Sequence, residues 1–229
     1  MGLIPVPGTN DLQPFRRHSV LVLEVLDDST SMRRDIPTMI DAINRYTGEL
    51  QKSGLTNILL ARWAFNSGKL AGYVPPRRIP SLLLSDFELV GRTPLYQATW
   101  FALNHALRKA QEYDTNESDT LTYTRIHTDG RDNSSKVDVS EVRELITSMF
   151  ATGKHIVQGF GYGSSEDFHR IFQQMGIPKE HIFVVTDTTP ENVRDTVASA
   201  GATSITMSIS RESFEEYMRT GQFSDQDDQ

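Results

Sequence analysis

The sequence predicts an α/β protein of three layers: a doubly wound, mostly parallel six-stranded sheet with one antiparallel edge strand and helices on both faces. Three observations predict it. Apolar runs alternate with amphipathic segments along most of the chain, which favours a parallel sheet covered on both faces. An Asn-Ser-Gly turn at residues 66–68 favours one antiparallel hairpin. Two apolar runs end in a carboxylate, at Asp27 and Asp129, as expected at the ligand-binding edge of such sheets.

Prolines and the spacing of apolar residues predict the elements in the first third of the chain. Residues 1–17 carry several prolines and are interpreted as an N-terminal leader. Residues 18–26 are expected to form a strand. Apolar positions spaced as on one helix face follow Asp35 and predict a helix of about four turns that ends before Gly54. Residues 57–65 and 70–74 are expected to form the hairpin strands.

The middle of the chain combines an irregular segment with a well-marked helix. Residues 75–91 are punctuated by prolines, while Leu82, Leu83, Leu84 and Phe87 still require burial. Thr93 and Pro94 predict a helix start, with the hydroxyl on the free amides and proline just inside. The helix is expected to run to about Tyr113.

The second half repeats the alternation. Strands are expected at 120–128, 155–161 and 181–185, with helices at 138–152 and 164–175, the latter capped by serine, and a last helix opening at Thr189 and Pro190. Beyond Gly201, residues 202–209 fit either strand or helix, 212–218 a short helix, and 221–229 an acidic disordered tail. Residues 18–220 are expected to form a single domain.

Composition excludes several classes of function. The 229 residues contain no cysteine, which excludes disulfides, thiolate nucleophiles and cysteine-based metal sites. A net charge of -7 argues against nucleic-acid binding, which relies on basic surfaces. No run approaches the roughly 20 apolar residues that span a bilayer, and no signal peptide is recognised. We expect a cytoplasmic protein that binds neither nucleic acid nor membrane.

The end of the first predicted strand presents a set of oxygen ligands. Asp27, Ser29 and Ser31 alternate along the chain, so an extended loop points their three side chains to one side. Asp28 heads no such triplet, because Met32 stands four positions after it. We expect Asp28 and Thr30 to face outward or to cap the following helix. With Thr93 and Asp129 added, the all-oxygen set suits Mg²⁺ or Mn²⁺ rather than zinc, and Ca²⁺ is also compatible.

These residues resemble the metal-ion-dependent adhesion site (MIDAS) of the von Willebrand factor A (VWA) domain family. The motif pieces are Asp27-Asp28-Ser29-Thr30-Ser31, Thr93 in Gly91-Arg92-Thr93-Pro94, and Asp129-Gly130. The resemblance covers residues 18–200 and implies the family's Rossmann-like fold. It further implies direct ligation by Ser29 and Ser31, ligation by Thr93 directly or through water, and aspartates acting mostly through water.

The resemblance implies a non-enzymatic module in which Mg²⁺ or Mn²⁺ bridges to an Asp or Glu of a protein partner. The chain looks like stand-alone bacterial or phage-type members that work inside cells with ATPases or other assemblies. Two alternatives stay open: a Mg²⁺-dependent phosphatase or hydrolase using Asp27, and a self-assembling structural protein with a filled metal site. Against the enzyme, Ser29 stands where phosphoryl-transfer sites carry a second aspartate.

Other motifs have simpler interpretations. The glycines in Gly159-Phe160-Gly161-Tyr162-Gly163 only faintly resemble a phosphate-binding loop and favour a turn after the fifth strand. His127 precedes Asp129 by two residues and is interpreted as a packed or surface histidine. Asp129-Gly130 followed by Asp132-Asn133 also fits an ordinary turn. The pairs Arg33-Arg34 and Arg77-Arg78 are interpreted as solvated, and either pair beside the metal would help to select an acidic partner.

Overall fold

The computed structural model describes residues 17–114, 118–164 and 166–197 and shows one six-stranded sheet. The strands lie in the order β3-β2-β1-β4-β5-β6. β3 runs antiparallel to β2, and every other neighbouring pair is parallel, which confirms the predicted fold class. Their bounds are β1 Arg17–Leu26, β2 Ile58–Ala64, β3 Gly68–Val74, β4 Ser118–Thr128, β5 His155–Tyr162 and β6 Ile182–Val185.

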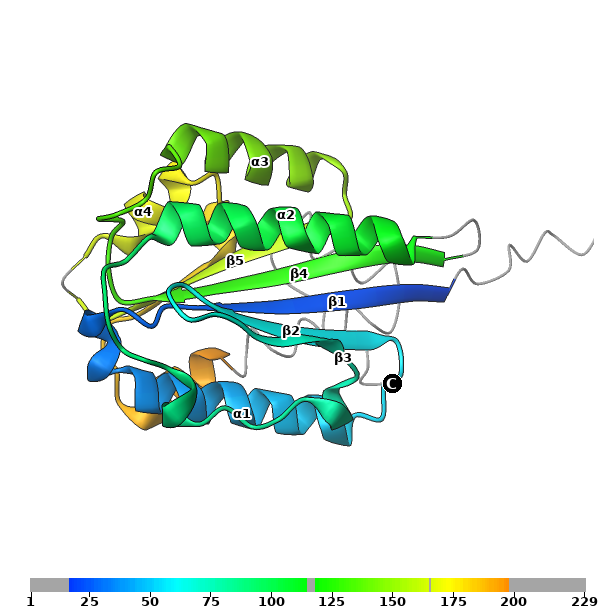
Figure 1. Ribbon diagram of the computed structural model, residues 1–229, viewed down its shortest axis with the longest axis horizontal. Coiled ribbons are helices and arrows are strands. Elements are labelled where there is room, and N and C mark those ends of the chain that lie inside the picture. The colour runs from blue at the N-terminus through cyan, green and yellow to red at the C-terminus, as the bar shows by residue number, and fades with distance from the viewer. Residues whose placement is uncertain (1–16, 115–117, 165, 198–229) are drawn as a thin grey trace, which may run out of the picture.

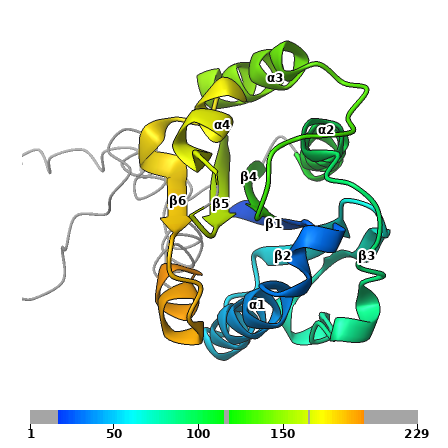
Figure 2. The ribbon, with the colours of Figure 1, turned by 90° about the vertical axis from the view of Figure 1, so that its left-hand side faces the viewer.

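Helices cover both faces of the sheet (Figures 1 and 2). One face carries α1 (Ile36–Lys52) and the helical residues 190–197, whose apolar side chains share a core with Val20, Val22 and Leu26 of β1. The other carries α2 (Leu95–Tyr113), α3 (Val139–Ala151) and α4 (Phe168–Gln174), packed on a second core that includes Leu23 and Val25. β1 is therefore buried on both sides, as its nearly continuous apolar sequence requires.

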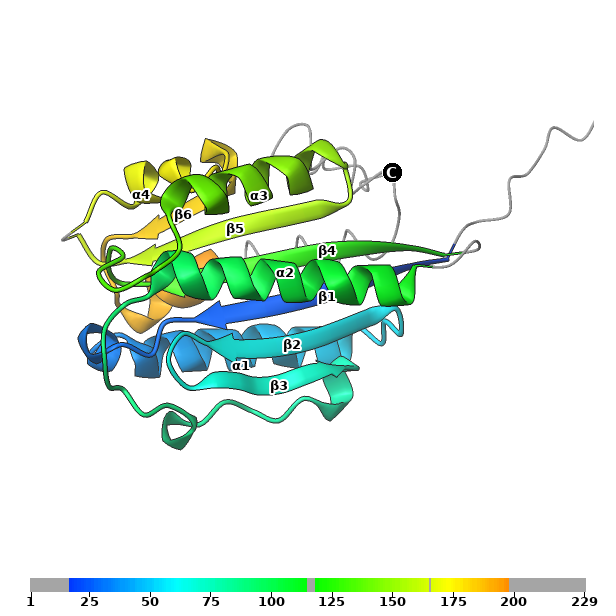
Figure 3. The same ribbon diagram turned by 45° about the horizontal axis from the view of Figure 1, so that its top comes forward.

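The register of the central strands brings the predicted site together. Leu26 at the end of β1 pairs with Ala64 of β2 and with His127 of β4, so these strands end at the same edge of the sheet (Figure 3). From β1 the chain continues to β2 on one side, and it later returns to β4 on the other. The carboxyl ends of β1 and β4 thus flank the point where strand order reverses, where α/β sheets bind ligands.

The glycines of β5 serve close packing rather than a turn or a phosphate loop. A Cβ atom on Gly159 would lie 2.6 Å from the ring of Phe172, and one on Gly161 would lie 2.1 Å from the ring of Phe168. Both rings belong to α4, which therefore sits directly on the β5 backbone. Gly163, with φ of +97°, does turn the chain after the strand.

Three local expectations were wrong. α4 begins at Phe168 rather than at Ser164, and Asp167 caps it by accepting a hydrogen bond from the Arg170 amide. α2 begins at Leu95, so Pro94 rather than Thr93 takes the N-cap position, and that residue makes no side-chain hydrogen bond to cap the helix. In the segment after β3, Leu82 and Phe87 are buried as expected, but Leu83 and Leu84 are 59% and 50% exposed. That segment forms two short 3-10 helices, η2 (Pro76–Arg78) and η3 (Leu84–Asp86).

Some expectations concern other parts of the chain. The leader up to residue 16, the elements expected at 202–209 and 212–218, and the acidic tail at 221–229 lie outside the described residues. Within the described residues, no helix combines the length and apolar character that crossing a membrane requires.

Candidate metal centre

Asp27 lies buried at the end of β1, and both of its carboxylate oxygens accept hydrogen bonds. Its Oδ1 accepts from the Ser29 amide at 2.8 Å, and its Oδ2 accepts from the Thr128 hydroxyl at 2.6 Å. The first bond curls the chain so that the loop leaves the strand at once. The second ties the end of β1 to the end of β4. Asp27 is therefore held inside the edge of the sheet, a position suited to acting through water rather than as a direct ligand.

Ser29, Ser31 and Asp129 form a continuous row of oxygen atoms. The hydroxyl oxygens of Ser29 and Ser31 lie 3.0 Å apart, and the Ser31 hydroxyl donates to Asp129 Oδ1 at 2.8 Å. Ser31 is the middle member of this row and lies in the 3-10 helix η1 (Thr30–Arg33), and its bond to Asp129 joins the loop after β1 to the end of β4. Residues nearly a hundred positions apart thus form a chain of three side-chain oxygens, each within hydrogen-bonding distance of the next.

Thr93 is held beside this row by the segment that follows β4. Its backbone amide donates to Asn133 Oδ1 at 2.9 Å, and its carbonyl accepts from the Asn133 amide at 3.1 Å. A Cβ atom on Gly130 would lie 3.8 Å from the Thr93 hydroxyl oxygen. The buried hydroxyl of Thr93 therefore lies next to the residue after Asp129, where the sequence places a fifth candidate ligand.

The residues between the candidate ligands brace the loops. Asp28 is fully buried rather than facing outward, and its carboxylate caps the β2–β3 turn by accepting from the amides of Asn66 and Ser67 at 2.7 and 2.9 Å. The Asn66 side chain in turn donates to the Arg92 carbonyl at 3.1 Å. Thr30 is exposed and donates to the Gly91 carbonyl at 3.2 Å. These contacts fix the backbone immediately before Thr93.

The two candidate aspartates occupy positions where negative charge is unfavourable. Burial raises the pKa of Asp27 to about 6, against the hydrogen bonds from Thr128 and Ser29 that lower it. Burial also raises the pKa of Asp129, with Asp35 adding repulsion, and the bond from Ser31 opposes the shift. A nearby cation would stabilise both carboxylates in their charged form.

The residues present fit a hard divalent cation. Every candidate ligand offers oxygen, in two carboxylates and three hydroxyls, which matches the preference of Mg²⁺ and Mn²⁺. In the part of the chain that the structure describes, no group of three or more His, Asp or Glu side chains is arranged to hold a metal. The fit therefore depends on the serine and threonine hydroxyls at this edge, seen end-on in Figure 2.

Sequence reasoning missed the side chains that position the site. Thr128 bonds Asp27, and Asn66 braces the loop before Thr93. Residues after Asp129 do not form a simple turn, because Asp132 and Ser135 accept hydrogen bonds from the Tyr96 and Gln97 amides of α2. One signal was available: Asp, Asn and Ser supply free helix amides with acceptors even from a distant segment.

No protein-family model matches this chain, and no curated protein matches it either. Solved structures do. The von Willebrand factor domain of the type V pili tip protein Mfa5 from Porphyromonas gingivalis is 13% identical with a TM-score of 0.54, covering 84% of this chain and 96% of that one. VWA2, the ArnB paralog from Sulfolobus acidocaldarius, is 14% identical with a TM-score of 0.51, covering 79% and 44%.

Proximal thread matrix protein 1 from the mussel byssus is 11% identical with a TM-score of 0.53, covering 84% of this chain and 49% of that chain. This chain thus spans about half the length of the mussel protein, which has also been solved with a zinc-occupied MIDAS motif. Identities this low carry the fold alone. That fold is the one found in von Willebrand factor A domains, and this chain has it.

Proposed function

We propose that this protein is a metal-dependent protein-binding module. One observation carries the proposal: the row of oxygens from Ser29 through Ser31 to Asp129 spans the switch point of the sheet, with Asp27 and Thr93 beside it. Structural neighbours with this fold include a pilus tip protein and a matrix protein whose MIDAS motif holds zinc. Those neighbours support metal binding and protein contacts in general.

In this proposal Ser29, Ser31 and Thr93 hold the cation with their hydroxyls, while Asp27 and Asp129 balance its charge. Bound Mg²⁺ or Mn²⁺ supplies an open coordination position for a carboxylate oxygen from an Asp or Glu of the partner protein. Neutral hydroxyls leave the cation electron-poor, so the site favours an anionic ligand. An ATPase or another intracellular assembly remains the proposed class of partner, and a cytoplasmic location remains a prediction.

The geometry of Asp27 favours a binding module over an enzyme. A carboxylate that attacks a substrate needs an exposed, free oxygen. Asp27 is buried, and both of its oxygens accept hydrogen bonds from Ser29 and Thr128. Asp28, the adjacent acid, is also buried and engaged by the β2–β3 turn. Neither acid is placed to act as a nucleophile.

Isothermal titration calorimetry tests the metal site. We expect Mg²⁺ or Mn²⁺ to bind the wild type. Zinc is titrated as well, because a structural neighbour holds it. Ser31→Ala removes the middle oxygen of the row and should weaken binding by about tenfold or more. Ser134→Ala, at an exposed position in the segment after β4, is the matched control. Absence of metal binding in the wild type, or equal affinities in the two variants, would contradict the proposal.

A pull-down with and without a chelator tests partner binding. We expect the chelator to release the specific partner, and Asp129→Ala to release it in the presence of Mg²⁺. An identical set of partners under all three conditions would argue against metal-dependent binding.

A further inference from the structure

An arginine accompanies each segment that supplies a candidate ligand. All of these arginine side chains are exposed, whereas the acids Asp28 and Asp35 in the same region are buried. At these segments the buried acids Asp28 and Asp35 thus point inward while the arginines face solvent. The arginines, which we call the arginine collar, are Arg33 and Arg34 after Ser31, Arg92 before Thr93 and Arg131 after Asp129.

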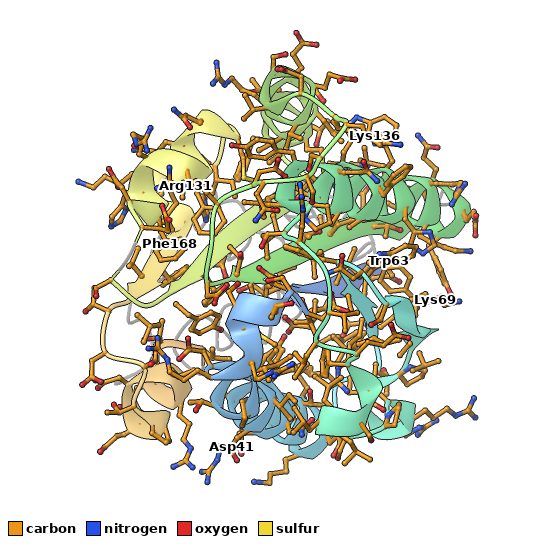
Figure 4. The ribbon with its side chains drawn as sticks, turned by 60° about the vertical axis from the view of Figure 1, so that its left-hand side comes forward. Asp41, Trp63, Lys69, Arg131, Lys136 and Phe168 are labelled. Carbon is orange, nitrogen blue, oxygen red and sulfur yellow. The ribbon has the colours of Figure 1, made fainter. Side chains whose placement is uncertain are left out.

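Two members of the collar already hold carboxylates. Arg34 donates to both oxygens of Asp35 at 3.2 and 3.1 Å, and Arg131 donates from Nε and Nη2 to Glu166 at 3.0 and 2.9 Å. Figure 4 shows Arg131 on the side of the edge where α4 lies. Arg34 thus engages both carboxylate oxygens in the forked geometry for which arginine is suited, whereas the two Arg131 nitrogens contact one oxygen, Oε2 of Glu166.

The other two members are available to a ligand. Within the described residues, the exposed side chains of Arg33 and Arg92 form no hydrogen bond or ion pair. Arg33 lies two residues from Ser31 and Arg92 one residue from Thr93, so their Cα atoms are at most about 7 Å from those of candidate ligands. Both backbones therefore start beside the site, and screening at physiological salt, with a Debye length of about 8 Å, limits the effect of these two charges to groups bound nearby.

We propose that the arginine collar selects an acidic segment of the partner: a peptide that carries at least one further carboxylate within a few residues of the one that reaches the metal. The inference rests on the proposed function. A chain with a net charge of -7 repels an acidic partner at long range. Arg33 and Arg92 reverse that repulsion at the site, so additional carboxylates gain affinity there and a solitary one does not.

Calorimetry with two blocked peptides tests the collar in excess Mg²⁺. Both peptides have the same length in a Gly-Ser background, one with a single Asp and one with three. We expect the three-Asp peptide to bind wild type roughly three- to tenfold more tightly, since each exposed ion pair contributes modestly. This advantage should shrink as salt is raised.

The variants assign the effect to the collar. The double substitution Arg33→Gln and Arg92→Gln should remove the advantage of the three-Asp peptide without lowering Mg²⁺ affinity, since it removes positive charge near the cation. The control is Arg77→Gln with Arg78→Gln, which changes the charge equally. Those arginines follow β3 in η2, and because Leu60 pairs with Val74 they lie at the opposite edge of the sheet.

The outcomes separate the two proposals. If wild type binds Mg²⁺ and has the same affinity for both peptides, the proposed role of the arginine collar is wrong and the proposed metal site stands. If wild type binds neither Mg²⁺ nor peptide, the proposed function fails and the collar fails with it. A phosphoserine peptide that binds more tightly than the three-Asp peptide, and depends on Arg33 and Arg92, would assign the surface to phosphate and overturn the inference.

Discussion

At the scale of single residues, a specific partner can position a buried polar side chain and set its charge. His155 at the start of β5 illustrates this, because its Nδ1 lies 2.8 Å from the Thr122 hydroxyl on β4 and its side chain is buried. Burial, together with the positive charge of Lys154, lowers the pKa of His155 to about 4. The folded protein therefore holds this imidazole neutral.

The His155 shift predicts how stability depends on pH. The folded pKa lies below the ordinary value of 6.5, so the proton binds the unfolded chain preferentially. Its stabilising contribution is complete above about pH 6.5 and is lost as pH falls toward 4, by roughly 2 kcal/mol at pH 5. Urea unfolding at pH 7.5 and pH 5 measures it. His155→Gln should reduce the difference between the two values, and His169→Gln, at an exposed position, should not.

At the scale of elements, the hairpin of β2 and β3 supports the candidate site without supplying a ligand. Asp28 holds the turn, and Asn66 in the turn holds the Arg92 carbonyl. Breaking this chain of bonds would remove one of the contacts that hold the backbone before Thr93, beside those of Thr30 and Asn133. The hairpin is therefore a brace for the loop between β3 and α2.

Asn66→Ala tests the brace. The variant keeps all five candidate ligands but loses the side-chain bonds to the Arg92 carbonyl and to Asp28. We therefore expect Mg²⁺ affinity to fall by about tenfold, as for other outer-shell partners of metal ligands. Asn104→Ala is the matched control, because its side chain bonds only the Trp100 carbonyl within α2 among the contacts of the described residues. Unchanged Mg²⁺ affinity in Asn66→Ala would show that the loop is positioned by other contacts.

The seat of α4 on β5 gives a second prediction at this scale. Gly161→Ala places a methyl group only 2.1 Å from the Phe168 ring, too close for van der Waals contact. It should destabilise the protein by about 1–3 kcal/mol. Gly48→Ala, inside α1 with no atom within 4 Å of the new Cβ, should instead stabilise it by about 0.5–1 kcal/mol. Thermal unfolding of the two variants separates tight packing from glycine replacement in general.

At the scale of the whole molecule, a row of buried polar side chains across four strands, which we call the polar belt, binds segments on one face to the sheet. Arg62, Glu24, Arg125 and Gln158 are register neighbours on β2, β1, β4 and β5. Arg125 donates to Glu24 at 3.1 Å and to the Val197 carbonyl in the last helix at 3.2 Å. Arg62 donates to the Thr47 hydroxyl of α1 at 2.7 Å and to the Pro80 carbonyl. The belt thus links α1, the last helix and the segment after β3.

Glu24→Gln tests the belt. Burial acts to raise the pKa of Glu24, but Arg125 and the hydrogen bond from His127 outweigh it and hold that pKa below its usual range. Glutamine would leave Arg125 charged and buried without its carboxylate, so we expect a loss of about 3–5 kcal/mol in unfolding free energy. Glu49→Gln breaks the exposed pair with Lys52 and should change it by less than about 0.5 kcal/mol.

The sequence by itself determined the element order, the antiparallel hairpin and the segments that carry Asp27, Thr93 and Asp129. Apolar periodicity and turn chemistry are local properties, and a strand that ends in a carboxylate is visible in the chain. The same local logic misplaced Thr93 as a helix cap, because Asp132 and Ser135, in a distant segment, accept hydrogen bonds from the α2 amides. It also placed the start of α4 at Ser164, where the nearby Asp167 is the cap instead.

Only the tertiary structure decided which side chains meet. Asn133 reaches Thr93 across forty positions, Thr128 reaches Asp27 across a hundred, and the glycines of β5 receive the rings of α4. Sequence spacing contains no information about such contacts, since they depend on strand order and register. The proposed arginine collar has the same basis, because its members come from separate segments and two of those segments meet only where β1 and β4 end side by side.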